Sequence, residues 1–348
     1  MDIRESLFAL CDLSGPSGFE QTAAKKAVEL LSPLMDEAYI DRFGNAVGVR
    51  RSKRSGAKKI LWDAHLDEIG LMVTGMEDGY LRFRTIGGVD PRMLPDRELT
   101  VLCEAPLLGV VTCLPPHLQT SQDQDKSVPL GDLFVDVGMS QEQAEKSIPV
   151  GTPMVFRGGC FSLGPDQVCG KSLDDRSCFV TLLRAAELLR GRDLDVDLYL
   201  IGSTREEVSG AGAKTASFCL APDCCVAVDV THGKTPDVQN PRDRSLELFE
   251  GPAIGVGPNM TRWMTERMVE KAKAEKIPYQ LEVMEGNTGT NGWGMQIARE
   301  GIATSVLSLP LKYMHSPIEV VAVEDMEHVA RLLAAFTEKL GKEGAFGV

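Results

Sequence analysis

Along most of the chain, apolar runs of strand length alternate with segments whose apolar residues recur at helical spacing. This pattern predicts strands at 58–64, 196–202, 224–230 and 303–309, and a strand-like stretch at 38–50 that bends at Gly44. It predicts helices at 19–35, 176–189, 210–218, 260–275, 292–300 and 323–340. Because strands alternate with helices, the predicted fold class is α/β, with a mostly parallel sheet covered by helices on both faces.

The pattern changes between about residues 70 and 165. Short β-type runs are separated there by glycine, proline and polar turns, with one short helix predicted at 140–147 and an exposed loop at 121–126. We interpret this segment as a small β-rich domain inserted into the α/β domain. The predicted boundaries are 1–68 and 165–348 for the discontinuous α/β domain and 69–164 for the insert.

Composition excludes several classes of protein. The 348 residues are 43% hydrophobic, enough for a sizeable core, and carry a formal net charge of −13, which disfavours binding to nucleic acids or anionic membranes. The first residues lack a secretory pattern, and no apolar run is long enough to span a bilayer. The nine cysteines show no CxxC spacing, which favours neither a disulfide framework nor a thiolate zinc site. A cytoplasmic location is therefore expected.

Ionisable residues gather where predicted strands end. The stretch KILWDAHLDEIG places His65, Asp67 and Glu68 at the end of an apolar strand, where burial would be costly without compensation. In doubly wound sheets, ligands bind at the carboxyl ends of strands. Four more stretches place acidic or histidine residues at or near such ends or at a helix start: Asp174 and Asp175, Glu206 and Glu207, Asp229, and His315.

Each of these residues also has a purely structural interpretation as a helix cap, a solvated loop or a turn. Their combination favours a metal site, because two histidines and three or more carboxylates without cysteine suit zinc or cobalt, including two ions that share one carboxylate. One carboxylate of the Glu206–Glu207 pair would then remain free as a general base. Asp67, two residues after His65, would orient the imidazole ring.

With these residues assembled, the sequence resembles the tetrahedral (TET), or glutamyl aminopeptidase-like, metallopeptidases of family forty-two, some of which have been labelled endoglucanases. The resemblance covers nearly the whole chain. The motifs that carry it are SGPSGFE (14–20), DRFGNAVG (41–48), AHLDEIG (64–70), DLFVDVGMS (132–140), GKSLDDR (170–176), TREEV (204–208), AVDVTHG (227–233), GPAIGVGP (251–258), TGTNGW (288–293) and YMHSP (313–317).

The resemblance implies roles for individual residues. Asp174 would bridge two metal ions. His65 and Glu207 would complete one site, Asp229 and His315 the other. Glu206 would be the general base, and a cis peptide bond would join Asp174 to Asp175.

The resemblance also implies that the inserted domain mediates dimerisation and that dimers assemble into a dodecamer. Two positions depart from the family pattern. Ser209 follows EEV where glycine is usual, and Asn291 stands where many members have an acidic residue.

These observations predict an aminopeptidase that removes the N-terminal residue of peptides with two divalent metal ions, zinc or cobalt. Three alternatives are an N-acyl amino acid deacylase, a glycoside hydrolase and a non-catalytic peptide-binding assembly. A glycoside hydrolase needs two carboxylates facing each other across a sugar, whereas Glu206 and Glu207 are neighbours, and aromatic residues are only 6% of the chain. His232 and Trp293 are expected to be structural, and Arg262 is a candidate for contacting an acidic side chain or a peptide carboxylate.

Overall fold

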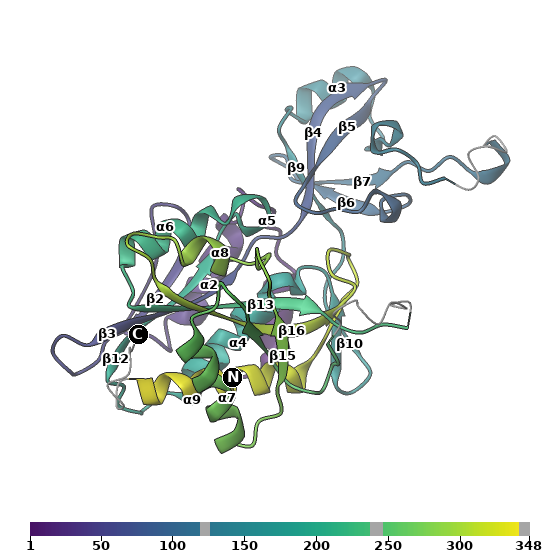
Figure 1. Ribbon diagram of the computed structural model, residues 1–348. Helices are drawn as coiled ribbons and strands as arrows, with labels where there is room; N and C mark the ends of the chain where they lie inside the picture. The colour runs from purple at the N-terminus through teal and green to yellow at the C-terminus, as the bar shows by residue number, and fades with distance from the viewer. Residues whose placement is uncertain (119–125, 237–245, 341–348) are drawn as a thin grey trace.

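The computed structural model describes residues 1–118, 126–236 and 246–340. It consists of an α/β body and a β-barrel that projects from one end of it (Figure 1). The predicted α/β class with an inserted β-rich module is confirmed. All nine cysteines are free. No helix in the described ranges has both the length and the apolar character that crossing a bilayer requires.

An eleven-stranded sheet forms the centre of the body. Its strands in spatial order are β1 (Glu37–Ile40), β2 (Ala46–Arg50), β12 (Val196–Ser203), β3 (Lys58–His65), β13 (Cys224–His232), β16 (Ala303–Lys312), β17 (Glu319–Ala322), β11 (Gln167–Gly170) and β10 (Phe161–Leu163). Two further strands, β14 (Ala253–Val256) and β15 (Gln280–Val283), extend it from β16. The predicted parallel pairing holds for β12, β3, β13 and β16, whereas both ends of the sheet are antiparallel.

Helices cover both faces of this sheet. The helices of the body are α1 (Ile3–Cys11), α2 (Gln21–Leu31), α4 (Leu173–Leu188), α5 (Glu206–Ser209), α6 (Ala211–Leu220), α7 (Arg262–Ala274), α8 (Gly292–Met295) and α9 (Val323–Leu340). Strand β3 shows the two-sided packing. Ile60 and Trp62 join the core that contains α4 and α9, while Leu61 joins the core that contains Ala213 of α6 and Met295 of α8. Because both faces of such a strand are buried, its sequence is a nearly continuous run of apolar residues, as at 58–64.

The helix predicted over 292–300 ends early, at Met295. Gly292 and Gly294 lie in its first turn, and glycine disfavours helix by about 1 kcal/mol relative to alanine. By contrast, α9 spans the predicted 323–340, where a strong apolar stripe packs against the sheet and α4.

The barrel contains β4 (Gly70–Glu77), β5 (Tyr80–Ile86), β8 (Val135–Asp136), β7 (Leu107–Val111), β6 (Glu98–Val101) and β9 (Pro153–Phe156), with α3 (Gln141–Ser147) beside it. Short 3-10 turns lie at Pro91–Met93, Pro116–Leu118 and Leu130–Asp132. Apolar side chains fill its interior. The predicted insert, 69–164, also includes β10, which pairs with β11 in the large sheet. The loop predicted at 121–126 lies, apart from Lys126, outside the described residues.

Candidate metal centre

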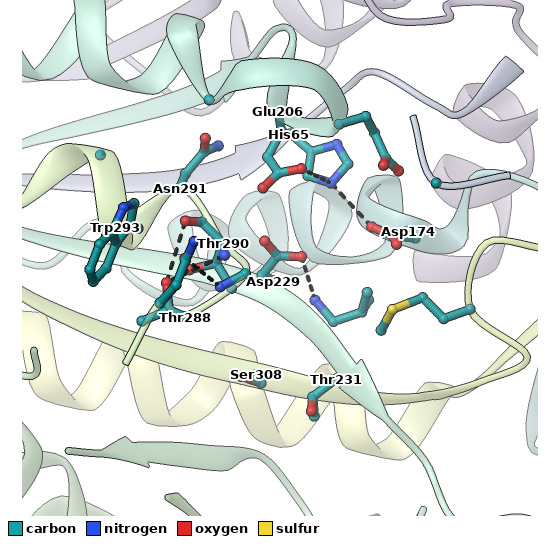
Figure 2. Close-up of a pocket in the computed structure, with 18 of the residues that line it drawn as sticks. His65, Asp174, Glu206, Asp229, Thr231, Thr288, Thr290, Asn291, Trp293 and Ser308 are labelled. Carbon is teal, nitrogen blue, oxygen red and sulfur yellow. Dashed lines mark hydrogen bonds and ion pairs between the residues drawn. The ribbon is translucent and has the colours of Figure 1, made fainter. Parts of the chain in front are cut away.

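The predicted ligand residues converge at the carboxyl ends of the central parallel strands (Figure 2). His65 is the last residue of β3 and Asp229 lies near the end of β13. Glu206 and Glu207 open α5 just beyond the end of β12, and His315 lies in the turn after β16. This is the edge where ligands bind in doubly wound sheets, because the strands and the helix starts leave a crevice there.

Asp174, in the first turn of α4, lies between the two histidines. Its Oδ1 is 3.1 Å from Nε2 of His65, and its Oδ2 is 3.4 Å from Nε2 of His315. Burial alone would raise the pKa of Asp174, but the two imidazole rings hold it well below its usual range. Each carboxylate oxygen therefore faces a different histidine, which is the arrangement that a shared ligand requires.

The remaining carboxylates surround this pair. Oε2 of Glu207 is 3.4 Å from Nε2 of His315, and Oε2 of Glu206 is 3.9 Å from Nε2 of His65. Potential ligand atoms of His65, Asp174 and Glu207 lie within 4.8 Å of one another, as do those of His65, Asp175 and Asp229. The first of these groups is the one that the resemblance implied, and the second also brings Asp229 to His65, while His315 contacts Glu207.

The carboxylates repel one another electrostatically. Burial, against the opposing charge of His65, raises the pKa of Glu206 to about 7. Burial and Asp174 raise the pKa of Glu207 to about 8, and burial and Asp175 raise the pKa of Asp229. Nitrogen and oxygen donors crowded in this way fit divalent cations such as zinc or cobalt, whose charge would offset the repulsion.

Asp67 fixes the start of α5 and the ring of His65. It accepts hydrogen bonds from the backbone N–H groups of Glu206 (3.0 Å) and Glu207 (3.1 Å) and from Oγ of Ser17 (2.5 Å). Nδ1 of His65 lies 3.1 Å from the Asp67 carbonyl oxygen and 3.5 Å from its Oδ1. The predicted contact between Asp67 and His65 is present, and the carboxylate also holds the two glutamates in place.

Glu68 belongs to a separate buried network. Its Oε2 accepts hydrogen bonds from Nζ of Lys171 and Oγ of Ser172, both 2.7 Å away, and its Oε1 accepts from the Gly15 N–H at 2.9 Å. Arg176 contacts the same carboxylate at 3.4 Å. Burial would raise the pKa of Glu68, but Lys171 and Arg176 lower it below its ordinary value. Glu68 therefore anchors the start of α4 and does not face the ligand cluster.

Two positioning residues were not identified from the sequence. Glu319 accepts the N–H groups of Asp174 (3.1 Å) and His315 (2.9 Å), one on each oxygen, and so links the two. The Gly88 carbonyl oxygen, just after β5 of the barrel, lies 3.0 Å from Nδ1 of His315. Glu319 could have been suspected because it is an acidic residue four positions after the candidate ligand His315. The residues around Gly88 in the sequence gave no such indication.

Non-glycine residues with left-handed backbone lie beside the cluster. The φ angles are +57° at Ser172, +61° at Arg205 and +61° at His315. Such conformations cost about 1–3 kcal/mol each and persist where the surrounding structure enforces them, often at functional sites. The cis peptide bond that the resemblance implied between Asp174 and Asp175 is confirmed.

A cavity of about 670 Å³ opens beside the cluster. His232 and Trp293, for which structural roles are expected, both line it, and the Trp293 side chain is 42% exposed. Arg262 does not line it, and its exposed side chain contacts Glu266 instead. Ser209 and Asn291, the two departures from the family pattern, both line the cavity, and the Asn291 side chain donates to Oγ of Ser203 at 2.9 Å.

The chain matches one family model and several aminopeptidases over most of its length. The model of the M42 glutamyl aminopeptidases matches residues 44–332. A lysyl aminopeptidase of Pyrococcus furiosus is 36% identical, and the match covers 97% of this chain and 97% of that protein. The TET aminopeptidase of the marine sediment archaeon Thaumarchaeota archaeon SCGC AB-539-E09 has a TM-score of 0.92 at 27% identity, covering 99% of each chain. The TET1 peptidase of Pyrococcus horikoshii, which can assemble into a tetrahedron or a large octahedral shell, has a TM-score of 0.84 at 28% identity, covering 97% of this chain and 100% of that one.

Proposed function

The chain belongs to the M42 glutamyl aminopeptidase family, and from this premise we propose that it removes the N-terminal residue of peptides with the help of two divalent metal ions. The observation that carries the proposal is the position of Asp174 between His65 and His315, with Glu206 beside His65. A shared carboxylate with an imidazole on each side and a further carboxylate nearby matches the needs of two-metal hydrolysis.

We assign Asp174 as the ligand common to both ions. His65 and Asp229 would complete one site, and Glu207 and His315 the other, since Asp229 lies within reach of His65 and Glu207 contacts His315, although Glu207 also lies within reach of His65. Zinc or cobalt suits this set of nitrogen and oxygen donors. When bound, two such ions supply Lewis acidity, which polarises a carbonyl group and makes water more acidic.

Glu206 is the residue we assign as general base. Its carboxylate accepts a proton from the water that attacks the first peptide carbonyl and then donates it to the leaving amine. A carboxylate that lies beside His65 and is not needed as a ligand is placed to take up and release this proton. Asp67 holds the Glu206 backbone N–H, which keeps the carboxylate beside His65 during both transfers.

We further propose that the chain associates with itself through the barrel and that dimers build a dodecamer. The support is the likeness to the Pyrococcus horikoshii peptidase and the apolar side chains on the outer face of the barrel. Peptides are the proposed substrates, and a cytoplasmic location stays a prediction.

The test is hydrolysis of aminoacyl-chromophore substrates and short peptides, each with a free and an N-acetylated amino terminus. The protein is assayed after chelation and again after zinc or cobalt is added back. We expect cleavage that depends on metal and occurs only at free amino termini. Faster hydrolysis of N-acyl amino acids would support the deacylase instead, and no cleavage by protein that carries two metals per chain would contradict both enzymes.

A further inference from the structure

The wall of the cavity carries a carboxylate that the proposed mechanism does not use. Glu282, on β15, lines the cavity, and its Oε1 accepts a hydrogen bond of 2.6 Å from Oγ1 of Thr231. Its Oε2 is buried and has no hydrogen-bond partner among the residues that the structure describes. Ser308 also lines the cavity, and its Oγ is likewise buried without a hydrogen-bond partner among the described residues.

This carboxylate lies a short distance from the ligand cluster. Thr231 follows the ligand candidate Asp229 by two residues on the same strand, so their side chains point to the same face about 7 Å apart. Because Glu282 is bonded to Thr231, a substrate side chain could begin near the metal-binding carboxylates and end at Glu282. The cavity lining includes Met284, Met314 and other apolar side chains, which suit the methylene stem of a long side chain.

We propose that Glu282 selects peptides whose N-terminal residue has a basic side chain, lysine or arginine. The inference rests on the proposed aminopeptidase function and names the substrate class of that same site. A buried carboxylate oxygen without a donor is costly, and an ammonium or guanidinium group would supply both the missing donor and the opposite charge. Lys214 also lines the cavity, but it is exposed, so water screens its attraction for an acidic side chain.

The decisive comparison pairs lysyl with norleucyl substrates, because norleucine keeps the lysine stem and lacks the ammonium group. We expect metal-loaded wild-type protein to hydrolyse the lysyl substrate with a kcat/KM about 10- to 100-fold above that of the norleucyl substrate, the range that a hydrogen bond to a charged group provides. Glu282→Gln should abolish this ratio and leave norleucyl hydrolysis nearly unchanged. The glutamine keeps an oxygen that can accept from Thr231, so the local structure is preserved.

Glu266→Gln is the matched control, because it removes a carboxylate from an exposed helix position outside the cavity. Calorimetric binding of free lysine and norleucine gives a second readout that does not depend on turnover. An equal or lower kcat/KM for lysyl than norleucyl substrates in the wild type, or an unchanged ratio in Glu282→Gln, would overturn the inference alone. Absence of hydrolysis for every substrate would overturn the proposed function as well.

Discussion

At the scale of single residues, Glu206 and Glu207 are neighbours in sequence whose carboxylates have different surroundings. The carboxylate of Glu206 faces His65, and that of Glu207 faces His315 and its carboxylate partner Asp174. Burial raises the pKa of both, to about 7 and about 8. Paired carboxyl groups divide acid–base and binding roles according to their surroundings, and here the surroundings differ within one helical turn.

Glu206→Gln tests this division directly. The substitution keeps the shape of the side chain but removes its ability to accept a proton, so kcat should fall by about 10²- to 10⁴-fold, the usual contribution of a general base. Metal content, measured by mass spectrometry after dialysis, should stay at two ions per chain. Near-full hydrolysis with both metals bound would show that another group is the base.

Glu68→Gln tests the buried network at the start of α4. Removing the charge leaves Lys171 and Arg176 buried without their carboxylate, which should lower the free energy of unfolding by about 3–5 kcal/mol at pH 7. The pKa of Glu68 is lower in the folded protein than its unfolded value of about 4.3, so its stabilisation is complete above that pH. It is lost as the pH falls through the folded-state pKa.

The difference between wild type and Glu68→Gln in urea unfolding should therefore shrink as the pH is lowered from 7 to below 4. A difference that does not change with pH would mean that the charge of Glu68 is not the source of the stabilisation.

At the scale of elements, long segments were predictable from the sequence, because the spacing of their apolar residues along the chain indicates which side chains are buried. Strand β3, strand β13 and helix α9 lie within a residue or two of their predicted bounds. The strands β14, β15 and β17 were not predicted, since each has only four residues and pairs at an edge or in an antiparallel end of the sheet. Their places depend on tertiary pairing rather than on local pattern.

The same reasoning applies to the site. Strand ends and residue chemistry predicted the candidate ligand residues, which the structure brings together. For Glu319 the sequence offered only its spacing from His315, and for Gly88 it offered no signal, because both contacts depend on how the loop after β16 meets α4 and the barrel. How the candidate ligands would divide between two metal ions likewise depends on distances between side chains on different elements, which the spacing of residues along the chain does not determine.

Gly88→Ala tests the contact between the barrel and the metal centre. A Cβ at this position would lie 2.6 Å from Nδ1 of His315, so the imidazole ring must shift. We expect the affinity for one of the two metals to fall about 10- to 100-fold, the usual effect of losing support for a ligand. Competition with a chromophoric chelator measures this affinity.

Gly131→Ala is the matched control, since an added Cβ there meets nothing within 4 Å and the backbone is not left-handed. Equal metal affinities in the two variants would show that the Gly88 contact does not position His315.

At the scale of the whole molecule, the barrel stands away from the body (Figure 1). Several of its apolar side chains are exposed. Along β7 the side chains alternate between the barrel interior and its surface, and Leu108 and Val110 are 51% and 41% exposed. Exposed apolar side chains on one element are typical of a surface that another chain covers.

The double substitution Leu108→Glu and Val110→Glu should shift the protein toward smaller species in light scattering coupled to size-exclusion chromatography. Burying two carboxylates without partners would be too costly for the interface to tolerate. Lys146→Glu, on the exposed side of α3, changes the net charge of the barrel by the same amount without removing an apolar side chain. An unchanged assembly in the double variant would place the interface elsewhere.

The contact between Gly88 and His315 also bears on modularity. The barrel has its own hydrophobic core and its own closed sheet, as a separate domain does. Yet the carbonyl group of Gly88, which belongs to the barrel, contacts the ring of His315, which belongs to the body. The candidate metal centre therefore includes a group from each of the two parts. A chimaera that exchanges barrels between relatives should therefore retain the two glycines between β5 and β6 in the incoming barrel, because the exchanged segment carries the carbonyl group that contacts His315.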